Sequence, residues 1–336
     1  ELAKNGEVGL VSTIPKGMNP GSDTANLSVM GYDPVKYYTG RSPLEAISIG
    51  AQMLADDVCF RVNFVHLTED EDEYDLKIIT DHSADEISTE EANELLQVIK
   101  DKYGDDIRHF YTGVSYRHAL IWNGGSTNIV LTPPHNILGK AITTHLPKGE
   151  NAEFIYKMMK ESYDLLNNHP VNVARREKGL RPANSIWPWG EGTKPEIPTF
   201  EKMFLKKGAM ISAVDLLKGI AIAAEMTSID VEGATGNIHT NYQGKVDAAI
   251  KTLEDGHEFV YIHIEAPDEC GHRGEMENKV LAIEYIDQKV VKPLVEHLNA
   301  KGIDFKLTVL PDHPTPLRTR THTSEPVPYF IYSSID

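Results

Sequence analysis

The most constraining feature of the sequence is a regular succession of strand-like and helix-like segments in the last third of the chain. Apolar strand-like runs occupy residues 208–214, 227–231, 257–264 and 304–310. Segments with apolar residues at helical spacing lie between them, at 215–225, 242–253 and 275–298. Strands that alternate with helices in this way are typical of a mostly parallel sheet sandwiched by helices. We therefore predict an α/β fold for this part of the chain.

The middle of the chain has a different pattern. Residues 58–67 and 108–122 are strand-like, and residues 152–166 form an amphipathic helical pattern. The stretch Ser88–Glu91 is a capping box, which predicts a helix from there to about residue 102. This mixture predicts an α+β domain over residues 58–199, inserted into a discontinuous α/β domain of residues 1–57 and 200–336. A hinge near residues 171–200, rich in Gly, Pro, Arg and Trp, would return the chain to the sheet.

Charge and cysteine usage exclude several classes of partner. The 336 residues carry 33 Lys and Arg against 50 Asp and Glu, a formal net charge of −17. Nucleic acids and anionic membranes require a basic surface, so neither is expected as a partner. A small anionic substrate remains compatible, since a local cluster of Arg, Lys and metal can overcome the global field. The two cysteines, Cys59 and Cys270, suggest no disulfide framework and a cytoplasmic location, and no apolar run reaches the roughly 18 residues of a membrane span.

Residue types that bind metals follow two of the predicted strands. The third strand leads to Asp268 and His272, the fourth leads to Asp312 and His313, and His322 lies ten residues beyond Asp312. Because open α/β sheets bind ligands beyond the carboxyl ends of their strands, we expect these side chains to meet at one edge of the sheet. Mixed carboxylate and imidazole ligands suit Mn, Zn or Fe better than Ca.

Five candidate ligands exceed what one tetrahedral site needs. Two metals roughly 3.5–4 Å apart would use them all, and many phosphoryl-transfer enzymes have this arrangement. Taken alone, either the Asp-His pair or the Asp-x-x-x-His pair is more simply a strand-end cap or a solvated pair. Their occurrence on successive loops, with a third His nearby, favours a metal centre.

Ser22 opens a helix-like segment near the start of the chain, directly after Gly21. The simpler interpretation is that Ser22 caps this helix. The functional alternative is a nucleophile, because a metal at its Oγ would lower the pKa of the hydroxyl and supply an alkoxide for attack on phosphorus.

Six stretches together resemble a known family. They read PKGMNPGSDTANLSVMGYDPVKYYTGRSPLEA, GVSYRH, GAMISAVDLLKGIA, GATGNIHTNYQGK, HIEAPDECGHRG and PDHPTPLRTRTHTSEPVPYFIY, and they extend over nearly the whole chain. On these motifs the chain resembles the archaeal-type cofactor-independent phosphoglycerate mutases of the alkaline phosphatase superfamily. The resemblance implies an alkaline-phosphatase-like domain that carries two metals and an inserted substrate-binding domain that closes over it.

The resemblance also implies roles for the metal-binding residue types. Asp268, His272 and His322 would hold one metal, and Asp312, His313 and Ser22 the other. Mn²⁺ is the preferred ion, with Zn²⁺, Co²⁺ or Mg²⁺ as alternatives. Phosphate would move from the substrate to Ser22 and return to the other hydroxyl of the reoriented glycerate. This reaction interconverts 3-phosphoglycerate and 2-phosphoglycerate without bisphosphoglycerate.

The substrate carboxylate and phosphate require polar and basic groups. The expected substrate-binding residues are Asn26, Arg117, His118, Arg175 and Arg181, with Arg176 as a further candidate. Lys218, in the DLLKG stretch, would neutralise the transferring phosphoryl group. The simpler alternatives are that Lys218 is a solvated helix residue and that the hinge arginines serve solubility. Trp187 and Trp189 are more simply packing residues than a lining of the cleft.

Two departures from the family pattern keep alternatives open. The family has a further ligand Asp at the end of a first strand, which would lie upstream of residue 1, and its C-terminal strand runs beyond residue 336. The stretch 183–190, with its two tryptophans, resembles bacterial members proposed to act as homoserine kinases. A homoserine phosphotransferase is therefore the alternative function, followed by a metal-dependent phosphatase or phosphodiesterase and by a non-catalytic binding module. A homo-oligomer is compatible with the sequence.

Overall fold

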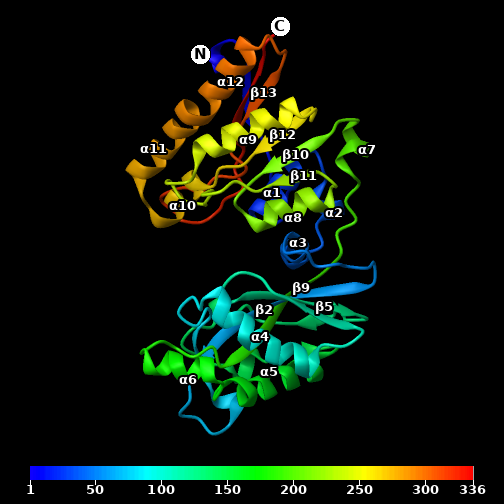
Figure 1. The fold of residues 1–336 in the computed structure, drawn as a ribbon, viewed down its shortest axis with the longest axis vertical. Coiled ribbons are helices and arrows are strands. Elements are labelled where there is room, and N and C mark those ends of the chain that lie inside the picture. The colour runs from blue at the N-terminus through cyan, green and yellow to red at the C-terminus, as the bar shows by residue number, and fades with distance from the viewer. Residues whose placement is uncertain (336) are drawn as a thin grey trace. The chain divides into compact units, whose positions relative to one another are not determined.

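The structure is a computed structural model that describes residues 1–335, and the chain divides into two compact units (Figure 1). Unit 1 comprises residues 1–38 and 196–336, and unit 2 comprises residues 39–195. The predicted boundaries lay at 57/58 and 199/200. Residues 39–57 group with unit 2 because α3 (Arg41–Ser48) packs on β2 (Asp57–Leu67), where Ala46 and Met53 join Cys59 in one apolar cluster.

Unit 1 contains the predicted parallel strands. Its parallel sheet has the order β11-β10-β12, with β10 at Gly208–Ile211, β11 at Thr227–Ile229 and β12 at Phe259–Ile262. The connecting helices are α8 (Asp215–Ala223) and α9 (Tyr242–Glu254). Ile211 of the central strand packs with Ala249 of α9 and Leu294, which forms one of the apolar clusters of this unit.

A second sheet of unit 1 differs from the prediction. It has the order β1-β14-β13, with β1 at Glu7–Val11, β13 at Lys306–Val309 and β14 at Val327–Ser333, and both pairings are antiparallel. The strand predicted at 304–310 thus lies outside the parallel sheet. Its partner β14 follows after residues 310–326, which contain no helix that could serve as the crossover of a parallel pair, so β13 and β14 pair antiparallel.

Unit 1 contains six further α-helices within the described residues. They are α1 (Ser22–Val29), α2 (Pro34–Tyr37), α7 (Phe200–Phe204), α10 (Ala266–Arg273), α11 (Met276–Ile286) and α12 (Lys292–Ala300). The predicted helix at 275–298 is confirmed as α11 and α12, joined by a π-helical turn at Asp287–Val291. Two apolar residues of this pattern on α11, Val280 and Ile283, are 53% and 54% exposed. None of the helices in the described part of the chain has both the length and the apolarity needed to cross a bilayer.

Unit 2 is an antiparallel sheet with helices, as the α+β pattern predicts. The sheet runs β4-β5-β2-β3-β7, and β9 also pairs with β2. The strands are β3 (Ile78–Asp81), β4 (Arg108–Tyr111), β5 (Arg117–Asn123), β7 (Lys140–Ala141) and β9 (Ser185–Thr193), with a separate pair of β6 (Ile129–Val130) and β8 (Lys148–Gly149). The helices α4 (Thr89–Tyr103) and α5 (Ala152–Leu166) share a core with Phe60 and Phe64 of β2.

Two local predictions in unit 2 have different outcomes. The N-cap half of the capping box is confirmed, because the Ser88 hydroxyl accepts a hydrogen bond from the Glu91 N–H at 3.2 Å and α4 follows, while the Glu91 carboxylate pairs with Arg175. The segment predicted as a hinge contains α6 (Pro170–Glu177) and β9. Its Pro and Gly residues did not prevent strand formation, because β9 pairs with β2 over most of its length and buries Ile186 and Trp187.

Candidate metal centre

Ser22 is the first residue of α1, and it does not cap that helix. The N-cap residue is Gly21, which has no side chain to accept a hydrogen bond. The Ser22 Oγ instead lies 3.0 Å from Nε2 of His313, 291 residues away in sequence. The capping interpretation therefore does not account for Ser22, and its hydroxyl faces the predicted metal ligands.

The helix α10 places Asp268 and His272 on one face, because residues four apart are neighbours on a helix. The Asp268 carboxylate lies 3.2 Å from Nε2 of His272 and 3.4 Å from Nε2 of His322. The two imidazoles direct their Nε2 atoms at each other, 2.9 Å apart. Two nitrogen atoms and a carboxylate that converge in this way are a donor set that fits a divalent cation.

Asp312 and His313 lie on the loop that follows β13. The ring of His313 lies against that of His322, with 3.9 Å between the ring centroids, and the Asp312 carboxylate lies 3.5 Å from Nε2 of His313. One ligand atom each from Asp268, His313 and His322 lies within 4.8 Å of the others. The structure therefore brings all five predicted ligands and Ser22 into one cluster, and His313 adjoins both predicted ligand sets.

The charges of this cluster are set by its hydrogen bonds. Burial alone would raise the pKa of Asp268, but hydrogen bonds from His322 and Thr315 outweigh it and lower the pKa to about 2. Burial lowers the pKa of His313. For His322, the bond to Asp268 and the charge of that residue outweigh burial and raise the pKa. Asp268 is therefore an anion at neutral pH, as a metal ligand must be.

Asn26 was predicted to bind substrate, but its amide is already engaged by neighbouring protein groups. It is fully buried on α1. Its Nδ2 donates to the Ser22 carbonyl at 2.8 Å and to Asp312 Oδ2 at 2.9 Å. Its Oδ1 accepts from the Tyr261 hydroxyl at 2.6 Å. The structure thus joins Asn26 to two predicted site residues rather than exposing it to a ligand.

Lys218 and a second lysine lie on the helices beside the parallel sheet. Lys218, at α8, forms an ion pair with Asp230 at 2.5 Å. Lys245, at α9, is fully buried and donates to the His263 carbonyl at 2.7 Å. Burial lowers the pKa of Lys245 to about 8, an effect that the nearby charge of Lys218 reinforces and that of Glu265 opposes.

Sequence reasoning missed three residues of the cluster. Thr315 donates to the Asp268 carboxylate, Thr13 donates to the Asp312 carbonyl, and Tyr261 bonds to Asn26. Thr315 could have been suspected, because it lies two residues after His313 in the ligand loop. Tyr261 and Thr13 gave no such signal, since an aromatic residue in a strand and a Thr near one have ordinary β propensity.

The predicted substrate residues of unit 2 fall into two groups. Arg117 is exposed on β5, beside a hollow of about 490 Å³ that Ser88, Ser115 and Tyr116 also line. His118, the next residue, is buried, and its Nδ1 accepts from the Gly113 N–H at 3.2 Å. Burial, reinforced by the charge of Lys100, lowers the pKa of His118 to about 3. His118 is therefore a neutral residue of the interior, and Arg117 is the accessible cation.

The arginines of the predicted hinge are bound to acidic partners. Arg175 is buried, pairs with Glu91 at 2.5 Å and donates to the Arg181 carbonyl at 2.9 Å. Arg181 pairs with Asp85 at 2.7 Å, and Arg176 pairs with Glu69. These contacts hold segments of unit 2 together, so the three guanidinium groups have structural partners.

The two tryptophans also have packing roles in unit 2. Trp187 is buried and donates to the Thr132 carbonyl at 2.8 Å. Trp189 donates to Asn63 Oδ1 at 3.0 Å, and the guanidinium of Arg61 stacks on its ring at 4.3 Å. The packing interpretation of the tryptophan pair therefore accounts for both residues.

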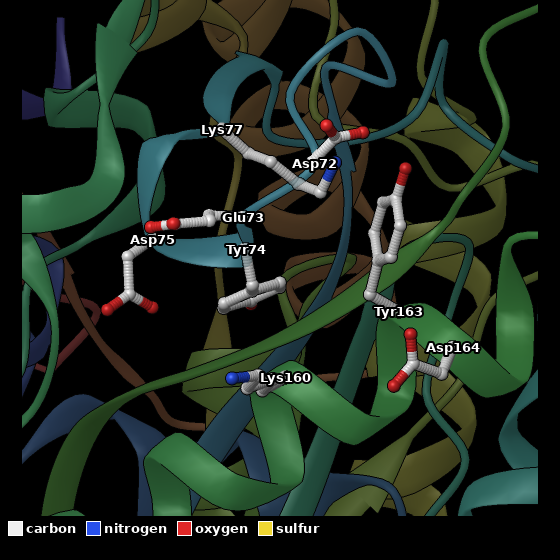
Figure 2. Close-up of a pocket in the computed structure, with 8 residues that line it drawn as sticks. All are labelled: Asp72, Glu73, Tyr74, Asp75, Lys77, Lys160, Tyr163 and Asp164. Atoms are coloured by element: carbon white, nitrogen blue, oxygen red, sulfur yellow. The ribbon is translucent and has the colours of Figure 1, made fainter.

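Another hollow of unit 2, of about 310 Å³, contains none of the predicted site residues (Figure 2). Its lining consists of Asp72, Glu73, Tyr74, Asp75, Lys77, Lys160, Tyr163 and Asp164. The buried Lys77 donates to the Glu71 carbonyl at 2.5 Å and lies over the Tyr163 ring at 4.3 Å. Four carboxylates in the lining disfavour an anionic substrate. The cluster in unit 1 therefore remains the candidate active site.

Comparisons with known proteins identify the family of the chain. The family model for 2,3-bisphosphoglycerate-independent phosphoglycerate mutase matches residues 3–172. A protein named as a probable mutase of this kind from Geobacter sulfurreducens is 49% identical over 99% of this chain and 82% of its own length. The chain belongs to the 2,3-bisphosphoglycerate-independent phosphoglycerate mutase family.

Other members of the mutase family support the assignment. The mutase from Methanosarcina barkeri is 46% identical over 98% of this chain and 81% of its own length. The solved structure of the cofactor-independent mutase from Thermoplasma acidophilum superposes with a TM-score of 0.64 at 27% identity, over 100% of this chain and 81% of that one. The resemblance found in the sequence is thus confirmed for the family and for its α/β fold.

Proposed function

We propose that this chain is a metal-dependent phosphoglycerate mutase that interconverts 3-phosphoglycerate and 2-phosphoglycerate through a phosphorylated Ser22. One observation carries the proposal: the Ser22 Oγ, at the start of a helix, lies 3.0 Å from His313 within a cluster of Asp and His side chains. The names of the relatives, all phosphoglycerate mutases that need no bisphosphoglycerate, support the choice of substrate.

The donor set fits two divalent cations, with Mn²⁺ as the preferred ion. Asp268, His272 and His322 would hold one, and Asp312, His313 and Ser22 the other. Bound cations lower the pKa of a coordinated hydroxyl and neutralise phosphoryl charge.

The residues of the chain carry out the phosphoryl transfer itself. Ser22 Oγ gives up its proton and attacks the substrate phosphorus, the bond to the glycerate oxygen breaks, and that oxygen takes up a proton as it leaves. The phosphoryl group stays on Ser22 while the glycerate turns. Attack by the other glycerate hydroxyl returns the phosphoryl group and restores Ser22. The N-terminus of α1, where Ser22 lies, favours the added negative charge. Arg117 of unit 2 is exposed and cationic, and it is our candidate for the residue that binds an anionic group of the substrate.

Homoserine is the alternative acceptor, because the tryptophan-bearing stretch 183–190 resembles that of proposed homoserine kinases. Packing within unit 2 accounts for both tryptophans without a substrate contact. Homoserine is therefore the second acceptor to test in the assay, and its phosphorylation in place of mutase turnover would favour the alternative. Label from ¹⁸O-water in released phosphate would reveal a phosphatase instead. We further propose a cytoplasmic location, and the two buried free thiols, Cys59 and Cys270, support it.

The test of the proposal is the variant Ser22→Ala. We expect mutase turnover to fall by at least about 10³-fold, because the nucleophile is lost. Mass spectrometry of the quenched wild-type protein should locate a phosphoryl group on Ser22. The matched control is Ser28→Ala, a serine on the same helix, which should retain turnover. A Ser22→Ala protein with wild-type turnover would overturn the phosphoserine mechanism.

A further inference from the structure

We propose that Tyr261 and Asn26 form a positioning relay that holds the Asp312 carboxylate in the orientation needed to bind a cation. The relay consists of two successive hydrogen bonds, from the Tyr261 hydroxyl to Asn26 Oδ1 and from Asn26 Nδ2 to Asp312 Oδ2, at 2.6 and 2.9 Å. This inference rests on the proposed function, because it assigns Asp312 to the metal centre. Neither Tyr261 nor Asn26 is a ligand or a reacting group in that proposal.

The three residues come from distant parts of the sequence and meet within unit 1. Asn26 lies on α1, one turn after Ser22, Tyr261 lies on β12, and Asp312 lies on the loop after β13. Asn26 is fully buried, and its second Nδ2 proton goes to the Ser22 carbonyl at 2.8 Å. One amide therefore ties the helix that carries the nucleophile to a ligand of the metal centre and to the parallel sheet.

The chemistry of the partners fixes the orientation of the Asn26 amide. The Ser22 carbonyl and the Asp312 carboxylate only accept hydrogen bonds, so the amino group must face them. The Tyr261 hydroxyl has a proton to donate, and the amide oxygen is the acceptor that faces it. Burial, together with the charge of Asp312, raises the pKa of Tyr261, so the phenol keeps this proton at any physiological pH.

Tyr261 matters because an asparagine amide can rotate by 180°. After such a rotation the amide oxygen would lie about where Nδ2 now lies, 2.9 Å from the Asp312 carboxylate, and two acceptors would face each other. The hydrogen bond from Tyr261 disfavours that state. The other Asp312 oxygen accepts from the His313 N–H at 2.9 Å, so the relay and this bond together hold the carboxylate at both ends.

The first test is Tyr261→Phe, which removes one hydroxyl and keeps the ring. Residues that orient metal ligands typically contribute about 10- to 100-fold to metal affinity. We expect a loss of that size in Mn²⁺ affinity at one of the two sites, measured by calorimetry and by the EPR signal of free Mn²⁺. Tyr332→Phe makes the same chemical change elsewhere in unit 1 and should leave Mn²⁺ binding unchanged.

A second variant tests the order of the relay. Asn26→Leu keeps roughly the shape of the side chain but removes both hydrogen bonds of the relay, and it should weaken Mn²⁺ binding as well. Because Tyr261 acts through Asn26, adding Tyr261→Phe to Asn26→Leu should cause little further loss. Additive losses in the double variant would mean that the two residues act separately, which contradicts the relay.

Activity provides a readout that distinguishes positioning from substrate contact. At subsaturating Mn²⁺, Tyr261→Phe should lower kcat while KM stays unchanged, and excess Mn²⁺ should restore kcat. A Tyr261→Phe protein that binds Mn²⁺ as the wild type does would overturn the relay. A wild-type protein that binds two Mn²⁺ ions but has no mutase turnover would instead overturn the proposed function and leave the metal-binding test intact.

Discussion

Asp268 shows how single side chains determine the charge of the candidate metal centre. Burial alone would favour the neutral acid, yet the hydrogen bonds from His322 and Thr315 keep this carboxylate ionised. Its oxygens lie within 3.4 Å of two imidazole nitrogens, so it is the shared anion of the cluster. A change that removes only its charge should therefore disturb cation binding more than it disturbs the fold.

We expect Asp268→Asn to lose one equivalent of tightly bound Mn²⁺ and to lower mutase turnover by at least about 100-fold. Metal analysis after dialysis measures the first effect and the enolase-coupled assay the second. The matched control is Glu269→Gln, the neighbouring residue on α10, whose side chain lies near Arg273 at 3.5 Å. Full metal content in Asp268→Asn would contradict its assignment as a ligand.

Burial of His118 makes the stability of unit 2 depend on pH. Its ordinary pKa of 6.5 falls to about 3 in the folded chain, so the unfolded chain binds the proton more readily between these values. The contribution of neutral His118 to stability is therefore complete above about pH 6.5 and is lost progressively as the pH falls toward 3. Between pH 7 and pH 5 this loss amounts to about 2 kcal/mol.

The test is urea unfolding followed by tryptophan fluorescence. In His118→Asn, where an amide oxygen can accept from the Gly113 N–H, the loss of stability between pH 7 and pH 5 should be smaller than in the wild type by about that amount. His109→Asn, an exposed histidine of the neighbouring β4, should behave like the wild type. Equal pH dependence in all three proteins would show that His118 is not buried in its neutral form.

The sequence was informative about residues whose spacing reflects shared chemistry, and less so about residues whose role depends on a distant partner. The position of Asp268 and His272 directly after a strand predicted that they lie at the sheet edge, whereas the helix that carries them, α10, was expected as a loop. Arg175 and Arg181 were expected at the substrate because sequence reveals a positive charge but not the acid that neutralises it. The roles of Asn26 and Tyr261 likewise depend on a distant partner, since 235 residues separate the two in sequence.

The helix α10 shows how an element positions a site. Asp268 and His272 lie on this helix, and Gly271 between them lies against the ligand loop. A Cβ added at Gly271 would lie 2.5 Å from the backbone oxygen of Thr315, which is too close for any real contact. The absence of a side chain here therefore lets α10 approach the loop that carries the other ligands.

We expect Gly271→Ala to push α10 away from this loop and to destabilise unit 1 by about 1–3 kcal/mol, the usual cost of overpacking. Mn²⁺ affinity should fall as well, because Asp268 and His272 move with the helix. Arg273→Ala, an exposed position on the same helix, should change neither quantity by much. Unchanged Mn²⁺ binding in Gly271→Ala would show that the approach of the two elements is not needed.

Elements with strong local signals were predictable. The helices α4, α5 and α9 followed from periodicity and caps, because their apolar faces repeat over three or more turns. The strand that pairs with β13 was not predictable, because the residues of a short apolar strand do not specify which neighbouring strand they pair with. The residues of β9 looked like a hinge for a related reason: Pro and Gly signal a break locally, and pairing with β2 outweighs that signal.

At the scale of the whole molecule, the two units have separate spectroscopic and chemical markers. All three tryptophans, Trp122, Trp187 and Trp189, lie in unit 2, whereas all the predicted metal ligands lie in unit 1. A ligand that binds only the folded state stabilises it by about 2.7 kcal/mol at a free concentration of 100 Kd. Mn²⁺ should therefore stabilise unit 1 selectively.

Calorimetry with Mn²⁺ or with EDTA tests this difference. We expect a calorimetric transition that moves to higher temperature with Mn²⁺, while the transition reported by tryptophan fluorescence changes less. Mg²⁺ at the same concentration should cause a smaller shift, because imidazole ligands suit Mn²⁺ better. No shift of any transition at millimolar Mn²⁺ would contradict the metal centre.

The most direct test of the central claim is turnover by the full-length protein loaded with Mn²⁺. The protein would receive 3-phosphoglycerate with no bisphosphoglycerate, and coupling to enolase would measure the 2-phosphoglycerate formed. The proposed function predicts turnover on the order of 1–1,000 per second, abolished by EDTA and restored by Mn²⁺. A metal-replete protein that forms no 2-phosphoglycerate would contradict the assignment of this Ser, Asp and His cluster to a mutase.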